Sequence, residues 1–259
     1  MSDLFNFAGV KRRSSDESYT ASDIEVLEGL EPVRMRPGMY IGGTDESAMH
    51  HLVSEVIDNS MDEAVAGYAN RISIEMFADG SISIADNGRG IPVDNHPKFP
   101  KKSALEVILT TLHSGGKFSD KAYQTSGGLH GVGISVVNAL AEKLNIEVYR
   151  NGFVYSQNYS KGHAITKLEK IVSSKKQKGT KITFIPDSEI FGRISLKPKR
   201  VYDLAKSKAY LYKGFEIHWS CSSELINNDE VPSKAVIHFP NGLEDYLDSK
   251  LDKKKIIGE

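Results

Sequence analysis

A cluster of acidic and amide side chains lies on one predicted helix in the N-terminal part of the sequence. The stretch from Ala48 to Ala66 contains no proline or glycine and has apolar residues at helical spacing. At about 100° per residue its polar side chains form one stripe opposite an apolar arc. The stripe consists of Glu55, Asp58, Asn59, Asp62 and Glu63. Carboxylates beside an amide oxygen suit Mg²⁺. A solvent-facing surface is the alternative, although no lysine or arginine lies among these acids to pair with them.

A second candidate is the turn that follows a predicted strand. Asp86 ends the run ISIAD, and Gly88 and Gly90 follow it within DNGRGIP. This order places a carboxylate acceptor where the backbone allows a flat ligand to approach closely. Since Asp-Asn-Gly turns are also common connectors, the turn alone is weak support for a site.

The third candidate is a glycine-rich loop before a predicted helix. It runs from Gly127 to Gly133 as GGLHGVG. Glycines at a helix start let backbone N–H groups surround a phosphate, and the helix dipole adds partial positive charge. The dinucleotide G-x-G-x-x-G pattern does not fit, and Ile134 stands where a Walker A lysine belongs. The loop is therefore a phosphate-binding loop of another kind or a flexible hinge. Lys117 adds a cation in the preceding loop, after Gly115 and Gly116, and Gly179-Thr180 opens a strand with a hydroxyl; neither is informative by itself.

These motifs need elements that hold them in place. A capped helix is expected from Ser22 to Leu30, where Pro32 limits it, and a hairpin from Arg71 to Ala85. A long loop from Ser114 to Gly128 has the length of a functional lid. Helices followed by a run of strands predict an α+β fold, a two-layer sandwich with helices on one face of a mixed, mostly antiparallel sheet.

Composition bounds the class of protein. The 259 residues are 39% hydrophobic and 26% charged, which is typical of a compact globular chain. Cys221 is the single cysteine, and no segment resembles a secretory or membrane-spanning stretch, so a cytoplasmic protein without a membrane partner is expected. The net charge of -1 argues against a dedicated nucleic-acid binder. The segment from Lys167 to Lys213 nevertheless carries 13 basic and 4 acidic residues. It is a solvated face or, less favoured, a contact for DNA or a phosphorylated partner.

Taken in order, the motifs resemble those of a known superfamily. EVIDNSMD, DNGRGIP, GGLHGVG and Gly179-Thr180 resemble the four nucleotide-binding motifs of the GHKL superfamily, which joins gyrase, heat-shock chaperones, histidine kinases and MutL and has the Bergerat ATPase fold. The segments 24–43 and 112–138 are similar to the ATPase subunits of bacterial type IIA topoisomerases. Gln124 and Ser119 resemble the B subunit of topoisomerase IV more than that of gyrase.

The resemblance implies a role for each matching residue. Glu55 would be the general base toward the water that attacks the γ-phosphate of ATP, and Asn59 would bind Mg²⁺. Asp86 would accept the adenine amino hydrogen, with Thr180 beside it. Glu63 would pair with Arg89. The other residues implied to contact the nucleotide are Tyr19, Asp62, Arg89, Pro92, Lys117, Gly127, Gly128, Leu129, His130, Gly131, Val132 and Gly133.

The resemblance also implies partners and an organisation. Residues 1–20 would be a flexible arm and residues 21–259 the ATP-binding domain, which forms a homodimer when ATP binds. The topoisomerase IV A subunit and DNA would be partners in the holoenzyme, and inhibitors could occupy the adenine pocket. The family's ATPase also uses a glutamine and a lysine of a following transducer domain, before which this sequence ends. The ATPase domain of a gyrase B subunit, or a nucleotide-gated dimerisation module with little turnover, are the alternatives. A kinase-type enzyme of the superfamily is disfavoured by RPGMYIGG.

Overall fold

A computed structural model describes residues 21, 24, 26–115, 132–173, 177–226 and 231–251 of the protein. The helices are α1 (Glu31–Met35), α2 (Gly38–Ile41), α3 (Glu46–Val65), α4 (Ala104–Thr110), α5 (Gly133–Ala139), α6 (Ser188–Phe191), α7 (Pro198–Leu211) and α8 (Leu243–Lys250), with the 3₁₀ turn η3 (Ser223–Leu225). The strands are β1 (Arg71–Met76), β2 (Ile82–Asp86), β3 (Asn95–His96), β4 (Phe99–Ser103), β5 (Ala141–Arg150), β6 (Phe153–Ser160), β7 (His163–Ala164), β8 (Glu169–Ser173), β9 (Gly179–Pro186), β10 (Glu216–Cys221) and β11 (Lys234–His238).

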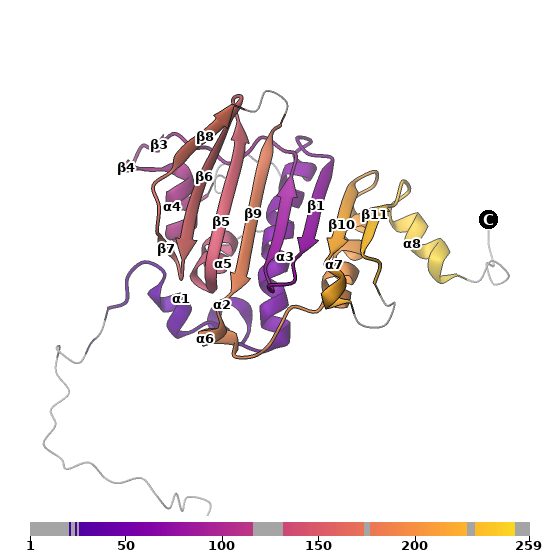
Figure 1. Ribbon diagram of the computed structural model, residues 1–259, viewed down its shortest axis with the longest axis horizontal. Coiled ribbons are helices and arrows are strands. Elements are labelled where there is room, and N and C mark those ends of the chain that lie inside the picture. The colour runs from indigo at the N-terminus through magenta and orange to yellow at the C-terminus, as the bar shows by residue number, and fades with distance from the viewer. Residues whose placement is uncertain are drawn as a thin grey trace, which may run out of the picture.

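One large mixed sheet forms the frame of the molecule (Figure 1). Its strand order is β11-β10-β1-β2-β9-β5-β6-β7, and β8 pairs with β6. Among the described pairs of this sheet, β1 with β10 is parallel and the others are antiparallel. The expected mixed, mostly antiparallel sheet is confirmed. The order differs from the order along the chain, because β9 and β10 flank the hairpin of β1 and β2 on its two sides.

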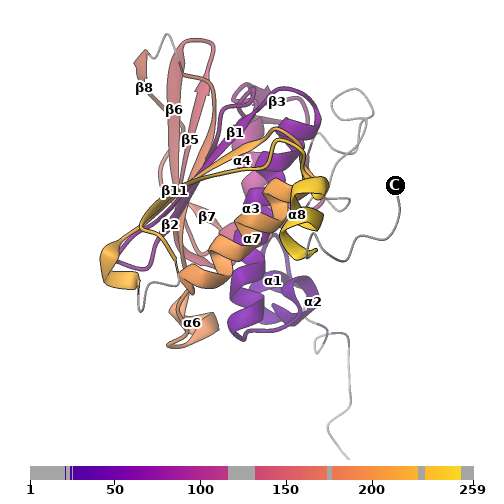
Figure 2. The same cartoon turned by 90° about the vertical axis from the view of Figure 1, so that its right-hand side faces the viewer.

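The helices cover one face of this sheet, as the view along its edge shows (Figure 2). Helix α3 packs on β1, β2 and β9, α5 on β5 and β6, and α7 on β10 and β11. Strand β1 shows how the faces divide, since Ile72, Ile74 and Met76 are buried and alternate with Arg71 and Glu75, which are exposed. The helices and the buried strand residues enclose one apolar core, which confirms the predicted two-layer sandwich.

Helix α3 is the element that carries the acidic stripe. Asp45 caps its N-terminus, where the Oδ1 atom accepts a hydrogen bond of 2.9 Å from the backbone N–H of Ala48. The helix continues to Val65, and Gly67 follows with a φ of +78° that reverses the chain. Val53, Val56, Ile57 and Met61 of its apolar arc are buried in the core. The predicted helix over residues 48–66 is confirmed.

The helix predicted from Ser22 to Leu30 is wrong for the residues that the structure describes there. Residues 26–28 are not helical, and the side chains of Ile24 and Val26 are 59% and 78% exposed. The first α-helix begins at Glu31 with Pro32 in its first turn. Proline suits the first turn of a helix because its missing N–H is unpaired there in any case. Pro32 therefore starts a helix rather than limiting one.

The structure adds short elements where the sequence indicated turns or loops. The turn-rich stretch after Arg34 contains α2, and the Pro/Lys loop before α4 contains the paired strands β3 and β4. A strand expected from the sequence over residues 164–168 is wrong, because only Ala164 lies in a strand, β7, and the next strand, β8, begins at Glu169. These elements are two to five residues long, which is too short for a periodic pattern to appear.

Candidate functional site

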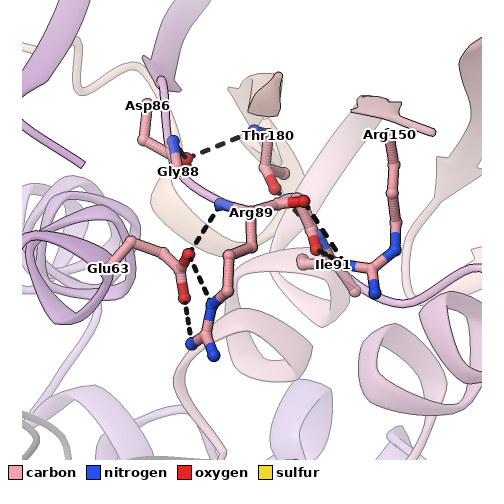
Figure 3. Close-up of polar contacts among 8 residues, drawn as sticks. Glu63, Asp86, Gly88, Arg89, Ile91, Arg150 and Thr180 are labelled. Atoms are coloured by element: carbon pink, nitrogen blue, oxygen red, sulfur yellow. Dashed lines mark hydrogen bonds and ion pairs between the residues drawn. The ribbon is translucent and has the colours of Figure 1, made fainter. Parts of the chain in front are cut away.

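Asp86 stands at the end of β2 and is bonded to two backbone segments (Figure 3). Its Oδ1 atom accepts hydrogen bonds from the backbone N–H of Gly88, at 2.8 Å, and of Thr180, at 3.3 Å. Burial raises the pKa of the Asp86 carboxyl to about 7 against the lowering effect of these bonds, and the nearby Glu63 carboxylate raises it further. A carboxylate that is buried and fixed in this way is ready to accept a hydrogen bond from a ligand.

Two glycines allow the backbone around Asp86 to come this close. A side chain at Gly179, whose φ is +122°, would overlap the backbone carbonyl of Asp86. A β-carbon at Gly88 would lie 2.7 Å from Glu63 Oε2 and 2.9 Å from Asp86 Oδ1. Gly88 and Gly179 are therefore explained by close packing around Asp86.

Glu63 joins α3 to the turn after β2. Its carboxylate accepts from the Arg89 guanidinium, with Nη2 to Oε1 at 2.7 Å and Nε to Oε2 at 3.2 Å. The backbone N–H of Arg89 also donates to Oε2, at 2.8 Å (Figure 3). The structure thus contains the Glu63–Arg89 pair that the resemblance implied.

Thr180 and Arg150 hold the far side of the same turn. The Oγ1 atom of Thr180 accepts a hydrogen bond of 3.2 Å from the backbone N–H of Ile91, and Arg150 Nη1 donates to the carbonyl of Gly90 at 2.7 Å (Figure 3). Pro92, which comes next, is exposed. The turn is therefore fixed between α3 on one side and strands β5 and β9 on the other.

Glu55 lies two turns earlier on α3, where this helix meets α5. The two helices are in contact, and a β-carbon built on Gly133 would overlap the Glu55 Oε2 atom. Glu55 is partly exposed, and its Oε1 atom is 3.1 Å from His51 Nε2. The carboxylate thus lies at the start of the helix that follows the glycine loop, with Val132 at its N-cap.

The structure divides the acidic stripe among several neighbours. Asp58 forms an ion pair with Lys208 of α7, Glu63 pairs with Arg89, and Asp62 is buried. Cations that the local sequence lacked therefore come from distant segments. Asn59 is partly buried on the same helix, one helical turn after Glu55, so these two side chains share the centre of the stripe.

The described residues form two groups joined by α3. The first contains Asp86, Arg89 and Thr180, and the second contains Glu55 and Gly133. Several site residues expected from the sequence lie outside the described part of the chain, so their positions stay predictions. They are Tyr19, Lys117, Gly127, Gly128, Leu129, His130 and Gly131.

Sequence reasoning missed two neighbours of these groups. His51 is one helical turn before Glu55, and that spacing was the signal that could have found it. Tyr68 places its ring over the Arg89 guanidinium, with 3.8 Å from Cζ to the ring centroid. No local pattern pairs residues 68 and 89, because they meet only when α3 packs on the sheet.

Asn87 has a structural task beside the site. Its Oδ1 atom accepts from the backbone N–H groups of Asn70 and Arg71, at 3.0 and 3.1 Å. It therefore fixes the start of β1 and is turned to that strand, while Asp86 is bonded to Gly88 and Thr180. The asparagine after Asp86 is compatible with the role predicted for that aspartate.

The basic segment from Lys167 to Lys213 is spread over β8, β9 and α7 rather than gathered on one helix. Among its described residues, four cations form ion pairs, which are Lys181–Glu147, Lys199–Asp203, Arg200–Glu46 and Lys208–Asp58. Such pairing favours the interpretation of this segment as ordinary charged surface.

Among the described residues, no group of three or more His, Cys, Asp or Glu side chains could hold a metal ion by itself. Over the same residues, every helix is too short or too polar to span a bilayer.

Comparison with known proteins agrees with this geometry. Residues 44–190 match the family model described as "Histidine kinase-, DNA gyrase B-, and HSP90-like ATPase". The match spans α3, the turn after β2 and the start of β9, which together form the site. The chain belongs to this ATPase family.

Individual relatives are more specific. The B subunit of DNA topoisomerase 4 from Rickettsia bellii is 64% identical over 99% of this chain, which spans only 39% of that relative. The topoisomerase IV ATP-binding domain of Francisella tularensis, solved with a small-molecule inhibitor, is 43% identical with a TM-score of 0.71, over 87% of this chain and 58% of that one. The 43K ATPase domain of Thermus thermophilus gyrase B, solved with an aminocoumarin, is 36% identical with a TM-score of 0.76, over 89% and 57%.

Proposed function

We propose that this chain is the ATP-binding and ATP-hydrolysing part of a topoisomerase IV B subunit. Residues 1–20 form an arm and residues 21–259 the nucleotide-binding domain. The observation that carries the proposal is the placement of Glu55 against Gly133 at the middle of α3, and of Asp86 against Gly88 and Thr180 beside the C-terminal end of that helix. A catalytic carboxylate and a base-binding carboxylate are thereby held on one rigid frame.

At the base end, the roles follow from the chemistry of the donors and acceptors. Asp86 accepts the hydrogen bond of the adenine amino group, and Thr180 lies beside it on β9. Arg89 and Pro92 line the edge of this pocket, and Glu63 holds Arg89 in place. Small inhibitors that mimic the adenine donor would occupy the same place, as the inhibitor complexes of the solved relatives suggest for this chain.

At the phosphate end, Glu55 accepts a proton from the water that attacks the terminal phosphate. General-base catalysis of this kind contributes roughly 10²- to 10⁴-fold in rate. His51 contacts the Glu55 carboxylate from one turn away and helps to orient it. In this proposal the remaining contacts to the nucleotide come from the loop of Gly127 to Gly133, from Lys117 and from Asp62. Tyr19 adds a contact from the arm of the other protomer.

The residues present fit a magnesium ion that arrives with the nucleotide. Mg²⁺ usually keeps waters and takes one or two protein oxygens beside phosphate oxygens. Asn59 offers an amide oxygen on the face of α3 that carries Glu55, and the described residues form no carboxylate cage that would hold the ion alone. When bound, the ion would neutralise charge that develops on the phosphates.

The proposed partners follow from the relatives. ATP binding would close a homodimer, and in the full-length protein the topoisomerase IV A subunit and DNA would join it, so that hydrolysis drives DNA strand passage in the cytoplasm. The identity to a topoisomerase 4 B subunit supports this assignment over gyrase, as does the lower identity to the gyrase structure than to the topoisomerase IV structure. Because this chain covers 39% of that relative, strand passage belongs to the full-length protein and not to these residues alone.

One experiment tests the proposal and separates catalysis from binding. ADP binding is measured by calorimetry, and ATP turnover is measured over a series of concentrations of the 259-residue chain. We expect binding of ADP and a turnover that rises with the square of protein concentration, because two chains form each active unit. Glu55→Gln should bind ADP normally and lose about 10²- to 10⁴-fold of turnover.

The matched control is Glu75→Gln, which changes an exposed carboxylate on β1. It should bind and turn over like the parent chain. Failure to bind ADP would overturn the proposal. Binding without turnover at any concentration would make the chain a nucleotide-gated dimerisation module instead of an ATPase.

A further inference from the structure

We propose that Tyr68 is a positioning residue that orients Arg89 and thereby sets the affinity of the pocket for adenine nucleotides. The inference rests on the function proposed above and adds a residue to it. It starts from the stack of the Tyr68 ring on the Arg89 guanidinium, at 3.8 Å from Cζ to the ring centroid. A guanidinium over an aromatic face is attracted by the ring quadrupole.

The two side chains hold each other at the surface of the pocket. The side chain of Arg89 is 34% exposed and Tyr68 is 46% exposed, so neither is fixed by burial. The Glu63 carboxylate binds one edge of the guanidinium and the Tyr68 ring covers one of its faces. Together these contacts restrict both the direction and the tilt of the Arg89 side chain.

Glu63 places both members of the stack. Its backbone carbonyl accepts hydrogen bonds from the N–H groups of Tyr68, at 2.8 Å, and Ala69, at 3.0 Å. Its carboxylate accepts from the backbone N–H and the guanidinium of Arg89. Gly67 makes the tight reversal possible through its φ of +78°. Glu63 therefore fixes both the end of α3 and the turn after β2, so that Tyr68 and Arg89 are held next to each other.

The position of Arg89 matters because it is next to the atoms that hold Asp86. Gly88 donates its N–H to Asp86 Oδ1, and the following N–H, of Arg89, donates to Glu63. If the Arg89 guanidinium moves off the Tyr68 ring, its hydrogen bonds to Glu63 change, and with them the position of the turn that holds Asp86. Loss of the stack should therefore weaken nucleotide binding and not catalysis. The proposed base, Glu55, lies two turns away from Glu63 on α3, against Gly133.

The experiment is a double-mutant cycle read out as the Kd for ADP. Tyr68→Leu should raise Kd about two- to fivefold, which is the size of a cation–π contact at a partly exposed site. Tyr68→Phe keeps the ring and should bind ADP like the parent chain. In an Arg89→Gln background, Tyr68→Leu should cause no further change, since the tyrosine acts through the arginine.

The control is Tyr246→Leu on α8, a tyrosine of 44% exposure with Lys250 near its ring, which should leave Kd unchanged. If Arg89→Gln fails to fold, Arg89→Lys removes the planar group and retains the charge.

Two results would overturn the inference while the proposed function stands. One is a Kd for Tyr68→Phe as weak as that for Tyr68→Leu, and the other is an equal effect of Tyr68→Leu with and without Arg89. A parent chain that binds no ADP would overturn the proposed function and this inference with it.

Discussion

The Glu55 carboxylate of α3 lies directly against the backbone of Gly133, the first residue of α5. The contact couples the proposed general base to the helix that follows the glycine loop. A residue with any side chain at position 133 would have to displace one of the two helices or turn the carboxylate away. The glycine is therefore part of the proposed catalytic geometry as well as of the loop.

Gly133→Ala should reduce ATP turnover and leave ADP binding at the base end nearly intact. The added methyl group would overlap Glu55 Oε2, and displacing a catalytic group by about 1 Å costs on the order of 10- to 100-fold in rate. Steady-state turnover and calorimetry on the same preparation measure the two effects. Gly43→Ala is the control, since a β-carbon there would find its nearest neighbour, Asp45 N, at 4.0 Å. Equal turnover in both variants would refute the coupling.

Nucleotide binding should depend on pH through Asp86. Its pKa of about 7 means that the carboxyl is ionised above that pH and protonated below it. Since Oδ1 already accepts two backbone N–H groups, a proton on the other oxygen would turn the proposed adenine acceptor into a donor. We expect the Kd for ADP to rise about tenfold between pH 8 and pH 6.

Asp86→Asn is the reference for this titration, because histidines and nucleotide phosphates titrate in the same range. The variant should bind ADP more weakly at pH 8 and lose the Asp86 part of the pH dependence. A parallel dependence in both proteins would rule out Asp86 as its source.

The same carboxyl should make the stability of the nucleotide-free protein depend on pH. Its folded pKa lies above the unfolded value of about 3.9, so the stability it contributes is complete below about pH 4 and is lost as the pH rises through 7. The loss is at most about 4 kcal/mol, for a shift of about three units. Urea unfolding of Asp86→Asn at several pH values should show less of this loss. An unchanged pH profile in the variant would contradict the raised pKa.

Arg34 should be important for stability rather than for binding. Its Nη2 atom pairs at 2.7 Å with Asp187, whose side chain is 1% exposed, and its Nη1 atom donates to the carbonyl of Ala139 at the end of α5. Arg34→Met leaves a buried carboxylate without its cation and should cost about 2–4 kcal/mol of unfolding free energy in urea titrations. Adding Asp187→Asn should recover part of it, because the buried charge is then removed. No recovery in the double variant would mean that the loss does not come from the unpaired Asp187 carboxylate.

The sequence was most informative about local patterns. The turn with Asp86, Gly88 and Gly90 could be recognised as a place where the backbone allows close approach, although such turns are also common connectors. The acidic stripe of α3 was visible from helical periodicity, and the structure places it where expected. Local rules sufficed in both cases because each pattern is complete within a short stretch of chain.

The sequence was least informative about contacts between distant segments. Lys208 pairs with Asp58 and Arg34 with Asp187, and in each pair the residues come together only through packing of separate helices and loops. The position of β10 beside β1 has the same cause. The prediction of a helix before Pro32 was wrong for another reason, because a proline can lie in the first turn of a helix as well as after its end.

The pairing of β1 with β10 has a consequence for how the chain folds. Strand β1, which begins at Arg71, pairs with β10, which begins only at Glu216. Helix α7 comes just before β10 and carries Lys208, which forms an ion pair with Asp58. During synthesis the hairpin of β1 and β2 leaves the ribosome long before its parallel partner, so one edge of it stays open until most of the domain exists. A chain interrupted before Pro198 would contain all four motifs that resemble those of the superfamily and would still lack β10, the strand that pairs with β1.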